Sequence, residues 1–153
     1  MAYKAQPQMV IVQGGGGNRN AKNLPVTAGG RDWSHGLCDC CSAPGTCIVA
    51  CCFPCITYGK NKNRFKHLSA KGVPHPDGGG CCTGDCCIHF IVASCGIACL
   101  LQCMSRGETR TRYNIKGSGC GDCCTACFCT PCDLVQESRE IELEEQSMGY
   151  LKH

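Results

Sequence analysis

Twenty cysteines among 153 residues are the side chains best suited to chemistry in this sequence. They are densest between Cys120 and Cys132, where six cysteines fall within thirteen residues and the spacing C-x2-C recurs. A C-x2-C pair supplies two soft donors from one tight turn, which is half of a tetrahedral site for Zn2+ or Cd2+. The pattern predicts metal ligation by thiolates, and it leaves disulfides, inert packing and S-acylation open as alternatives.

The chain contains five C-x2-C pairs, and their ten cysteines are the candidate metal ligands. They are Cys38, Cys41, Cys52, Cys55, Cys120, Cys123, Cys124, Cys127, Cys129 and Cys132. The separations between pairs do not reproduce a zinc-finger framework, so we expect a thiolate cluster. Cys52-Phe53-Pro54-Cys55 also has the spacing of a dithiol redox motif, but that motif starts a helix after a strand, and no strand is predicted here.

The redox state of these thiols depends on the compartment. The N-terminal residues hold only a short apolar run, Val10 to Val12, whereas a secretory signal needs roughly 7–15 apolar residues. We therefore expect the chain to stay on the cytosolic side, where thiols are kept reduced. Cysteines beside basic residues, such as Cys51, Cys52, Cys55 and Cys103, are then also candidates for palmitoylation.

Charge is divided unevenly along the chain. Residues 1–132 carry thirteen basic and six acidic side chains, a balance of +7, whereas residues 133–153 carry two basic and six acidic, a balance of −4. The basic side chains follow apolar segments directly, which favours an anionic lipid surface as partner. Aromatic residues are too few and too separate from the basic run for a nucleic-acid platform, so no nucleic-acid partner is expected.

Conventional catalysis has little support in the sequence. Gly14–Gly17 and Gly78–Gly80 lack the flanking strand and helix of a phosphate-binding loop. His35, His67, His75 and His89 could each serve as a base or ligand, but lone histidines are far more often solvated or part of a core. We expect no enzymatic activity.

Two apolar segments, residues 46–58 and 86–104, are predicted as short helices, and Pro54 is expected to kink or end the first. Irregular cysteine-rich loops would separate them from a C-terminal helix starting at Asp133 and solvated over most of its surface. The predicted fold class is a small, cysteine-rich, mainly α domain with room for a structural metal. It spans residues 32–141, between a disordered Gly/Asn-rich tail at 1–31 and an acidic tail at 142–153.

Residues 86–104 carry no formal charge and would form a helix roughly 28 Å long, close to the hydrocarbon thickness of a bilayer. A buried helix of a soluble domain is the alternative. Basic clusters follow both apolar segments, so one span, a shallow hairpin or two interfacial helices satisfies the positive-inside rule better than two spans. Pairing of such short helices predicts a homo-oligomer.

These expectations assign two sets of side chains to the membrane. The apolar set faces the lipid and consists of Ile48, Val49, Phe53, Ile56, Phe90, Ile91, Val92, Ile97, Leu100 and Leu101. The basic set meets the headgroups and consists of Lys60, Lys62, Arg64, Lys66, Arg106, Arg110 and Arg112.

Cysteines recur at four-residue spacing in both apolar segments. One trio is Cys47, Cys51 and Cys55, and the other is Cys95, Cys99 and Cys103. This spacing puts each trio on one helical stripe. The stripes predict either a thiol-lined seam between the two helices or close helix packing through small side chains, without a ligand.

Four motifs occur in order along residues 33–140. They are W-S-x-G-L-C-D-C from Trp33, C-C-F-P-C-I-T-Y-G-K from Cys51, R-x-x-Y-N-I-K-G from Arg110 and C-x-x-C-D-L-x-Q-E-x-R-E from Cys129. This pattern resembles the placenta-specific-8 or cornifelin-like cysteine-rich family, which includes plant cadmium-resistance proteins, cell-number regulators and many fungal members. The resemblance implies a membrane-associated protein, often of the plasma membrane, with roles in divalent-metal tolerance or efflux and in growth control.

The sequence departs from the family's C-C-x4-C-P-C motif at two positions. Cys47, Pro54 and Cys55 match it, but Ile48 and Phe53 stand where the family has cysteines. One soft donor of the metal path that the family implies is therefore missing, although Cys52 lies beside it.

Two functions follow as hypotheses. In the first, the protein handles Zn2+ or Cd2+ at the plasma membrane through cytosolic-facing cysteines, with Cys52 and Cys55 near the membrane and Cys120–Cys132 as the ligand cluster. In the second, it is a membrane-anchored interaction or growth-regulatory protein whose metal is structural or absent, and acidic residues 133–145 bind a partner.

Overall fold

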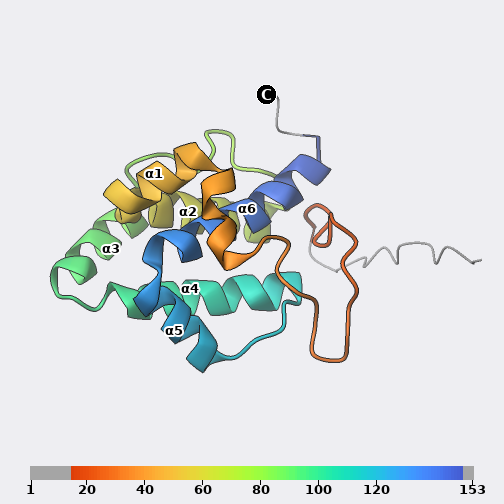
Figure 1. The fold of residues 1–153 in the computed structure, drawn as a ribbon. Helices are drawn as coiled ribbons and strands as arrows, with labels where there is room; N and C mark the ends of the chain where they lie inside the picture. Colours follow the sequence, from red (N-terminus) through yellow and green to blue (C-terminus); the bar gives the residue numbers. More distant parts are fainter. Residues whose placement is uncertain (1–14, 150–153) are drawn as a thin grey trace, which may run out of the picture.

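The computed structural model describes residues 15–149. It contains a 3-10 helix, η1 (Leu37–Ser42), followed by α1 (Pro44–Cys52), α2 (Pro54–Lys71), α3 (Gly84–Ser94), α4 (Ala98–Tyr113), α5 (Gly119–Phe128) and α6 (Thr130–Ser147) (Figure 1). Between residues 15 and 149, β pairing is limited to isolated bridges from Thr27 to Gly30 and from Arg31 to Ile115. The predicted mainly helical, cysteine-rich class is confirmed.

Helix α6 is the element around which the others pack. Helices α1, α2, α4 and α5 and the 3-10 helix η1 all contact it. Two small hydrophobic clusters lie along it. One joins Ala50 and Tyr58 to Leu134 and Val135, and the other joins Leu68, Tyr113 and Ile115 to Ile141.

The helix predicted at residues 46–58 is interrupted as expected from Pro54, because the chain leaves the helical conformation at Phe53. Phe53 has φ −136° and ψ 65°, which fits the rule that proline excludes the helical region for the residue before it. Pro54 then starts α2, where its missing N–H is no loss. Helix α2 continues through the basic run to Lys71 and closes at Gly72, whose φ of 68° is left-handed.

The prediction of a single helix over residues 86–104 is wrong. Helix α3 ends at Ser94 and α4 begins at Ala98, and the connection contains Gly96 with a φ of 76°. A left-handed residue cannot continue a right-handed helix, so the apolar segment is divided in two. Within residues 15–149, no helix combines the length and the apolar character needed to cross a bilayer.

The expected irregular loops around Cys120–Cys132 are helical instead. Ser118 caps α5 by accepting a hydrogen bond from the Gly121 N–H at 3.2 Å. The chain leaves the helix at Cys129, with φ −142° and ψ 65°, and α6 starts at Thr130 with Pro131 in its first turn. This junction has nearly the same backbone conformation as the α1–α2 junction at Phe53. In both cases, a short cysteine-rich helix leads through one residue into an 18-residue helix that has proline at its start.

The C-terminal helix is buried, so the prediction that it is mostly solvated is wrong. Its buried residues are Asp133, Leu134, Val135, Gln136, Glu137, Ser138, Glu140, Ile141, Glu144 and Glu145. Arginines from other elements pair with four of the five buried carboxylates, as in the 2.6 Å contact between Arg106 Nη1 and Asp133 Oδ1. A carboxylate is tolerated in a protein interior when it is paired and hydrogen-bonded.

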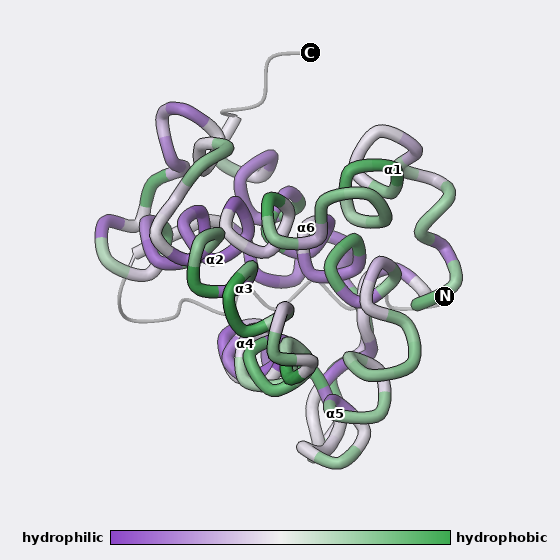
Figure 2. Tube along the Cα trace, turned by 90° about the vertical axis from the view of Figure 1, so that its left-hand side faces the viewer, coloured by the Kyte–Doolittle hydropathy of each residue, from purple (hydrophilic) through white to green (hydrophobic). Residues whose placement is uncertain are grey.

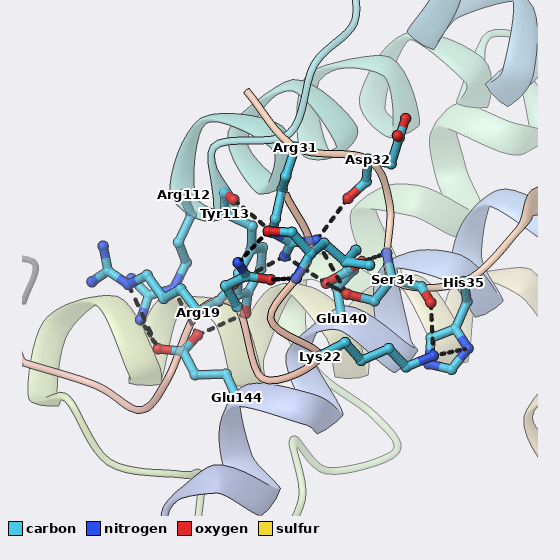
Figure 3. A network of polar contacts seen from close by, with 12 residues as sticks. Arg19, Lys22, Arg31, Asp32, Ser34, His35, Arg112, Tyr113, Glu140 and Glu144 are labelled. Atoms are coloured by element: carbon cyan, nitrogen blue, oxygen red, sulfur yellow. Dashed lines mark hydrogen bonds and ion pairs between the residues drawn. The ribbon is translucent and has the colours of Figure 1, made fainter. Parts of the chain in front are cut away.

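Residues 15–31, expected to be part of a disordered tail, lie against α4 and α6. Arg31 is only 2% exposed, and its Nη2 lies 3.0 Å from Glu140 Oε2 while its Nε donates to the Tyr113 carbonyl. Tyr113 and Arg112 both bind Glu144, through the Tyr113 hydroxyl at 2.7 Å and Arg112 Nη2 at 2.7 Å (Figure 3). The segment is thus tied to α6 by charge. Residues 1–14 of the expected tail lie outside the described residues.

Glu137 is the carboxylate with the least favourable environment on α6. Its Oε2 accepts a 3.4 Å hydrogen bond from Ser105 Oγ, and its Oε1 has no hydrogen-bond partner. Burial and the neighbouring Asp133 raise the pKa of Glu137 well above its ordinary value, opposed by Arg106 of α4 and Lys62 of α2. The native state therefore binds a proton that the unfolded chain releases, and stability falls as pH rises through the native pKa.

We predict that Glu137→Gln increases the free energy of unfolding by about 1–3 kcal/mol at neutral to alkaline pH, because folding of the amide variant requires neither uptake of a proton nor burial of a charge at this position. The variant should also gain less stability than the unaltered protein when the pH is lowered. Part of the gain should remain, because burial raises the pKa of Asp133 to about 6. Denaturant unfolding at about pH 8 and about pH 5 measures both effects. Glu142→Gln, at the partly exposed edge of α6, is the control. Equal destabilisation by Glu137→Gln at both pH values would contradict the assignment.

Candidate thiol site and apolar surface

Four cysteines face one another across the contact between α4 and α5. Cys99 and Cys103 lie one turn apart on α4, and Cys123 and Cys127 lie one turn apart on α5. The Sγ atoms of Cys103 and Cys123 are 2.9 Å apart, and the Cys99 thiol lies close enough to Cys127 to raise the pKa of that thiol. We call these four residues the thiol ladder, since two sulfur pairs bridge two adjacent helices.

Two of the ladder thiols, Cys103 and Cys127, have a pKa above the ordinary value of cysteine. The hydrogen bond with Cys123, together with burial, raises the pKa of Cys103 to about 11. The neighbouring Cys99 thiol likewise raises the pKa of Cys127. A soft cation binds thiolate, so its binding here would displace protons and would strengthen as pH rises.

A second sulfur cluster joins η1 to the start of α6. The Sγ atoms of Cys40 and Cys132 lie 3.6 Å apart. Cys40 also contacts the thiols of Cys41 and Cys47. Burial and then the contact with Cys40 raise the pKa of Cys47 to about 11.

A third, smaller group lies between α2 and α3. Here burial and then the contact with Cys55 raise the pKa of Cys86 to about 11. Cys55 is thus placed beside a buried thiol rather than beside the other candidate ligands.

The ten predicted ligands are spread over these groups. Cys123 and Cys127 belong to the thiol ladder, and Cys129 and Cys132 are joined in a disulfide, so in this form they are not thiolate donors. Five others have exposed side chains, namely Cys38, Cys41, Cys52, Cys120 and Cys124. In the described part of the chain, no group of three or more His, Cys, Asp or Glu side chains is arranged to hold a metal ion.

Two members of the ladder, Cys99 and Cys103, were absent from the predicted ligand set. The C-x2-C rule selected residues that are close in sequence, whereas the ladder is built from i, i+4 pairs on two helices. The signal was nevertheless present, because Cys99/Cys103 and Cys123/Cys127 share the same four-residue spacing. The predicted seam between residues 47–55 and 95–103 does not form, and the seam lies between α4 and α5 instead.

Large apolar side chains collect on the surface of α1, α3 and the start of α4. Figure 2 shows these segments as hydrophobic, whereas much of α2 and α6 is hydrophilic. Of the ten side chains assigned to the lipid, seven are exposed, namely Ile48, Val49, Phe53, Phe90, Ile91, Ile97 and Leu100. The other three, Ile56, Val92 and Leu101, are partly buried. Exposed apolar side chains that gather in a patch are typical of interaction sites, so these seven residues are candidates for one.

The ladder lies next to this apolar surface. Leu100 and Met104 of α4 are each more than half exposed and directly follow Cys99 and Cys103. On α5, Cys127 precedes Phe128, whose side chain is 89% exposed. The thiols and the exposed apolar side chains therefore occupy the same ends of α4 and α5.

Most of the basic side chains assigned to headgroups bind carboxylates of the chain itself. The pairs are Lys62 with Glu108, Arg64 with Glu145, Lys66 with Asp85, Arg106 with Asp122 and Asp133, Arg110 with Asp122, and Arg112 with Glu144. Arg106 also stacks over the Trp33 ring at 4.1 Å. Lys60 instead lines a cavity of about 350 Å³ with Thr57 and Glu142. Three of the six acidic partners, Asp133, Glu144 and Glu145, come from α6, which was expected to face solvent.

Comparison with known proteins decides the family. The model of the PLAC8 family matches residues 33–140, which is the span that carries the four sequence motifs. The chain belongs to the PLAC8 family. The family recognised from the motifs is thus confirmed, and the match extends from Trp33, which stacks on Arg106, to Glu140, which binds Arg31.

Plant proteins are among the relatives of this PLAC8 chain. The chain is 33% identical over 121 residues to the protein plant cadmium resistance 2 of Arabidopsis thaliana, covering 78% of this chain and 74% of that protein. It is 34% identical over 123 residues to plant cadmium resistance 1 of the same species, with the same coverage. Cell number regulator 11 of Zea mays is 32% identical over 111 residues, covering 72% of this chain and 63% of the relative. Among solved structures, none matches the chain significantly.

Proposed function

We propose that this protein binds soft divalent cations such as Zn2+ or Cd2+ through thiolates while it lies on a membrane surface. The observation that carries the proposal is the thiol ladder, four cysteines facing one another between two adjacent helices. The cadmium-resistance names of two relatives support the choice of a soft cation. Metal tolerance would follow from holding the cation at the membrane.

The donor set of the ladder fits such a cation chemically. Four thiolates are the ligands that Zn2+ and Cd2+ accept in tetrahedral geometry, and soft sulfur disfavours Mg2+ and Ca2+. The sulfurs lie as two pairs, so binding requires rotation of the cysteine side chains toward one centre. Cysteine has a single side-chain torsion before its sulfur, so this adjustment leaves the helices in place.

The membrane part of the proposal rests on the exposed apolar residues. No charged residue occurs between residues 46 and 58 or between residues 86 and 104, so a partner of this surface must be apolar over a wide area. A lipid surface fits because short helices can lie in the interface with their apolar side chains inserted. Most nearby cations already have carboxylate partners, so insertion contributes most of the binding. The net charge of +3 adds attraction to anionic lipids, as on the cytosolic face of the plasma membrane.

The alternative interaction role needs a different surface from the one expected. Acidic residues 133–145 were the candidate partner site, but α6 buries most of them against arginines. A protein partner, or a second copy of this chain, would therefore use the exposed apolar surface. The proposal includes no catalytic role.

Our prediction for metal binding concerns the four ladder thiols. Replacing Cys103 and Cys123 together with serine should weaken Cd2+ and Zn2+ binding at least about a hundredfold, because hard hydroxyls replace soft donors. Binding by the unaltered protein should strengthen between about pH 6 and about pH 8, because thiol protons must leave. Competition titration against a chelator of known affinity, together with the ultraviolet absorption of Cd–thiolate bonds, measures both effects.

The matched control replaces Cys120 and Cys95, which are exposed and outside the ladder. The affinity of this control for Cd2+ and Zn2+ should stay within about twofold of that of the unaltered protein. Metal binding that is lost equally in the control, or that persists in the Cys103/Cys123 variant, would contradict the assignment of the site.

Membrane binding is predicted to depend on the exposed apolar side chains. Phe90→Ser, Ile91→Ser and Leu100→Ser should each weaken binding to vesicles by a factor of about five, the equivalent of about 1 kcal/mol of apolar insertion. Sedimentation with vesicles of phosphatidylcholine and phosphatidylserine gives the partition coefficients.

Val26→Ser is the control, since Val26 is 51% exposed but belongs to the N-terminal segment and not to α1, α3 or α4. Equal vesicle binding by all variants would reject the lipid assignment. A stable dimer in solution that the α3 and α4 substitutions dissociate would instead identify a second copy of the chain as the partner.

A further inference from the structure

The junction between α5 and α6 carries a disulfide with a third sulfur beside it. Cys129 and Cys132 are joined in the segment Cys129-Thr130-Pro131-Cys132, where Cys129 is the residue preceding α6 and Cys132 lies in its first turn. Cys40, from η1, places its Sγ 3.6 Å from Cys132 Sγ. All three residues are partly exposed, so small reagents reach them.

We propose that Cys129–Cys132 is an exchangeable disulfide, with Cys40 as its intramolecular exchange partner and low-molecular-weight thiols and disulfides as its substrates. A separation of 3.6 Å brings the two sulfurs to van der Waals contact, the distance from which thiolate attack begins. This site is separate from the thiol ladder and shares none of its cysteines.

The exchange is balanced within the chain. The Cys40 thiol loses its proton to solvent, and its thiolate attacks Cys132 Sγ. The bond between Cys40 and Cys132 forms as the bond between Cys129 and Cys132 breaks, and Cys129 leaves as a thiolate that takes a proton from solvent. No net oxidation occurs, so no external oxidant is needed.

The position of Cys129 favours it as the leaving group. It precedes an 18-residue helix, and the partial positive charge at a helix N-terminus stabilises a neighbouring thiolate. A low-molecular-weight thiol would use the same leaving group. Its thiolate attacks Cys132, the mixed disulfide forms, and a second thiol releases reduced Cys132 together with the small disulfide.

The exchange changes what the disulfide joins. Cys129 and Cys132 are 3 residues apart in sequence, whereas Cys40 and Cys132 are 92 apart. The first linkage is local to one junction, and the second ties η1 to α6. A longer closed loop restricts the unfolded chain more, so the Cys40–Cys132 form should have the higher melting temperature. The surrounding thiol couple would thus set how firmly η1 is held against α6.

The chain supplies its own comparison at the α1–α2 junction. Cys52-Phe53-Pro54-Cys55 also leads into an 18-residue helix with almost the same backbone conformation, yet its two cysteines are not bonded to each other. Cys55 contacts the buried Cys86 instead. Cys52→Ser is therefore a control for a C-x2-C cysteine at a similar helix junction that is not disulfide-bonded.

The experiment maps the disulfides of the full-length protein after equilibration in buffers of reduced and oxidised glutathione. Free thiols are blocked with N-ethylmaleimide at low pH, the protein is digested, and linked peptides are quantified by mass spectrometry. We expect Cys129–Cys132 and Cys40–Cys132 peptides together in the unaltered protein, in a ratio that stays constant after the buffer is removed. In Cys129→Ser, most Cys132 should be linked to Cys40, and in Cys52→Ser the map should not change.

Other outcomes overturn the proposal. Cys40 is rejected as the partner if Cys132 of the Cys129→Ser variant stays a free thiol or carries only glutathione. It is also rejected if Cys132 forms disulfides with many different cysteines. If circular dichroism shows that Cys129→Ser does not fold, the unaltered protein decides the question, because absence of a Cys40–Cys132 peptide at every glutathione ratio rejects the exchange.

Cys40→Ser should also slow reduction of Cys129–Cys132 by glutathione at most about twofold, since the external thiol attacks directly.

Discussion

The pairing of buried carboxylates on α6 with arginines from the rest of the chain is the interaction on which this structure depends. Asp133, Glu140, Glu144 and Glu145 each meet a guanidinium, and the four arginines come from α2, α4 and the N-terminal segment. The hydrophobic clusters beside them are small. Buried ion pairs add little net stability compared with apolar packing, but losing one partner leaves an uncompensated charge. The pairs therefore specify which helices meet α6.

This arrangement decides what is left for function. Several charged side chains are buried in ion pairs. Large apolar side chains of α1, α3 and α4 and many of the cysteines are exposed. The distribution differs from the usual one, in which charged side chains are seldom fully buried. A chain organised in this way presents thiols and apolar residues together at its surface, which is the arrangement that the proposed function uses.

Local features of the fold were predictable from sequence, and long-range ones were not. Pro54 was correctly expected to interrupt its helix, because proline acts on its immediate neighbours. The burial of α6 was missed because its apolar stripe of Leu134 and Ile141 is thin, and burial of its carboxylates depends on partners such as Arg106, 27 residues away. Only two of the four cysteines of the thiol ladder were predicted as ligands, for the same reason. Cys123 and Cys127 were chosen from local spacing, whereas their partners on α4 are identified only once α4 and α5 are packed together.

The most direct test of this account is the coupling free energy between Arg106 and Asp133, whose contact of 2.6 Å is buried and isolated from solvent. Unfolding of Arg106→Met, Asp133→Leu and the double variant gives this energy as a double-mutant cycle. We expect each single substitution to destabilise the protein by about 3–5 kcal/mol and the pair to be less than additive by at least about 2 kcal/mol. Single effects within about 0.5 kcal/mol that simply add, as for an exposed ion pair, would contradict the central role of the buried acidic helix.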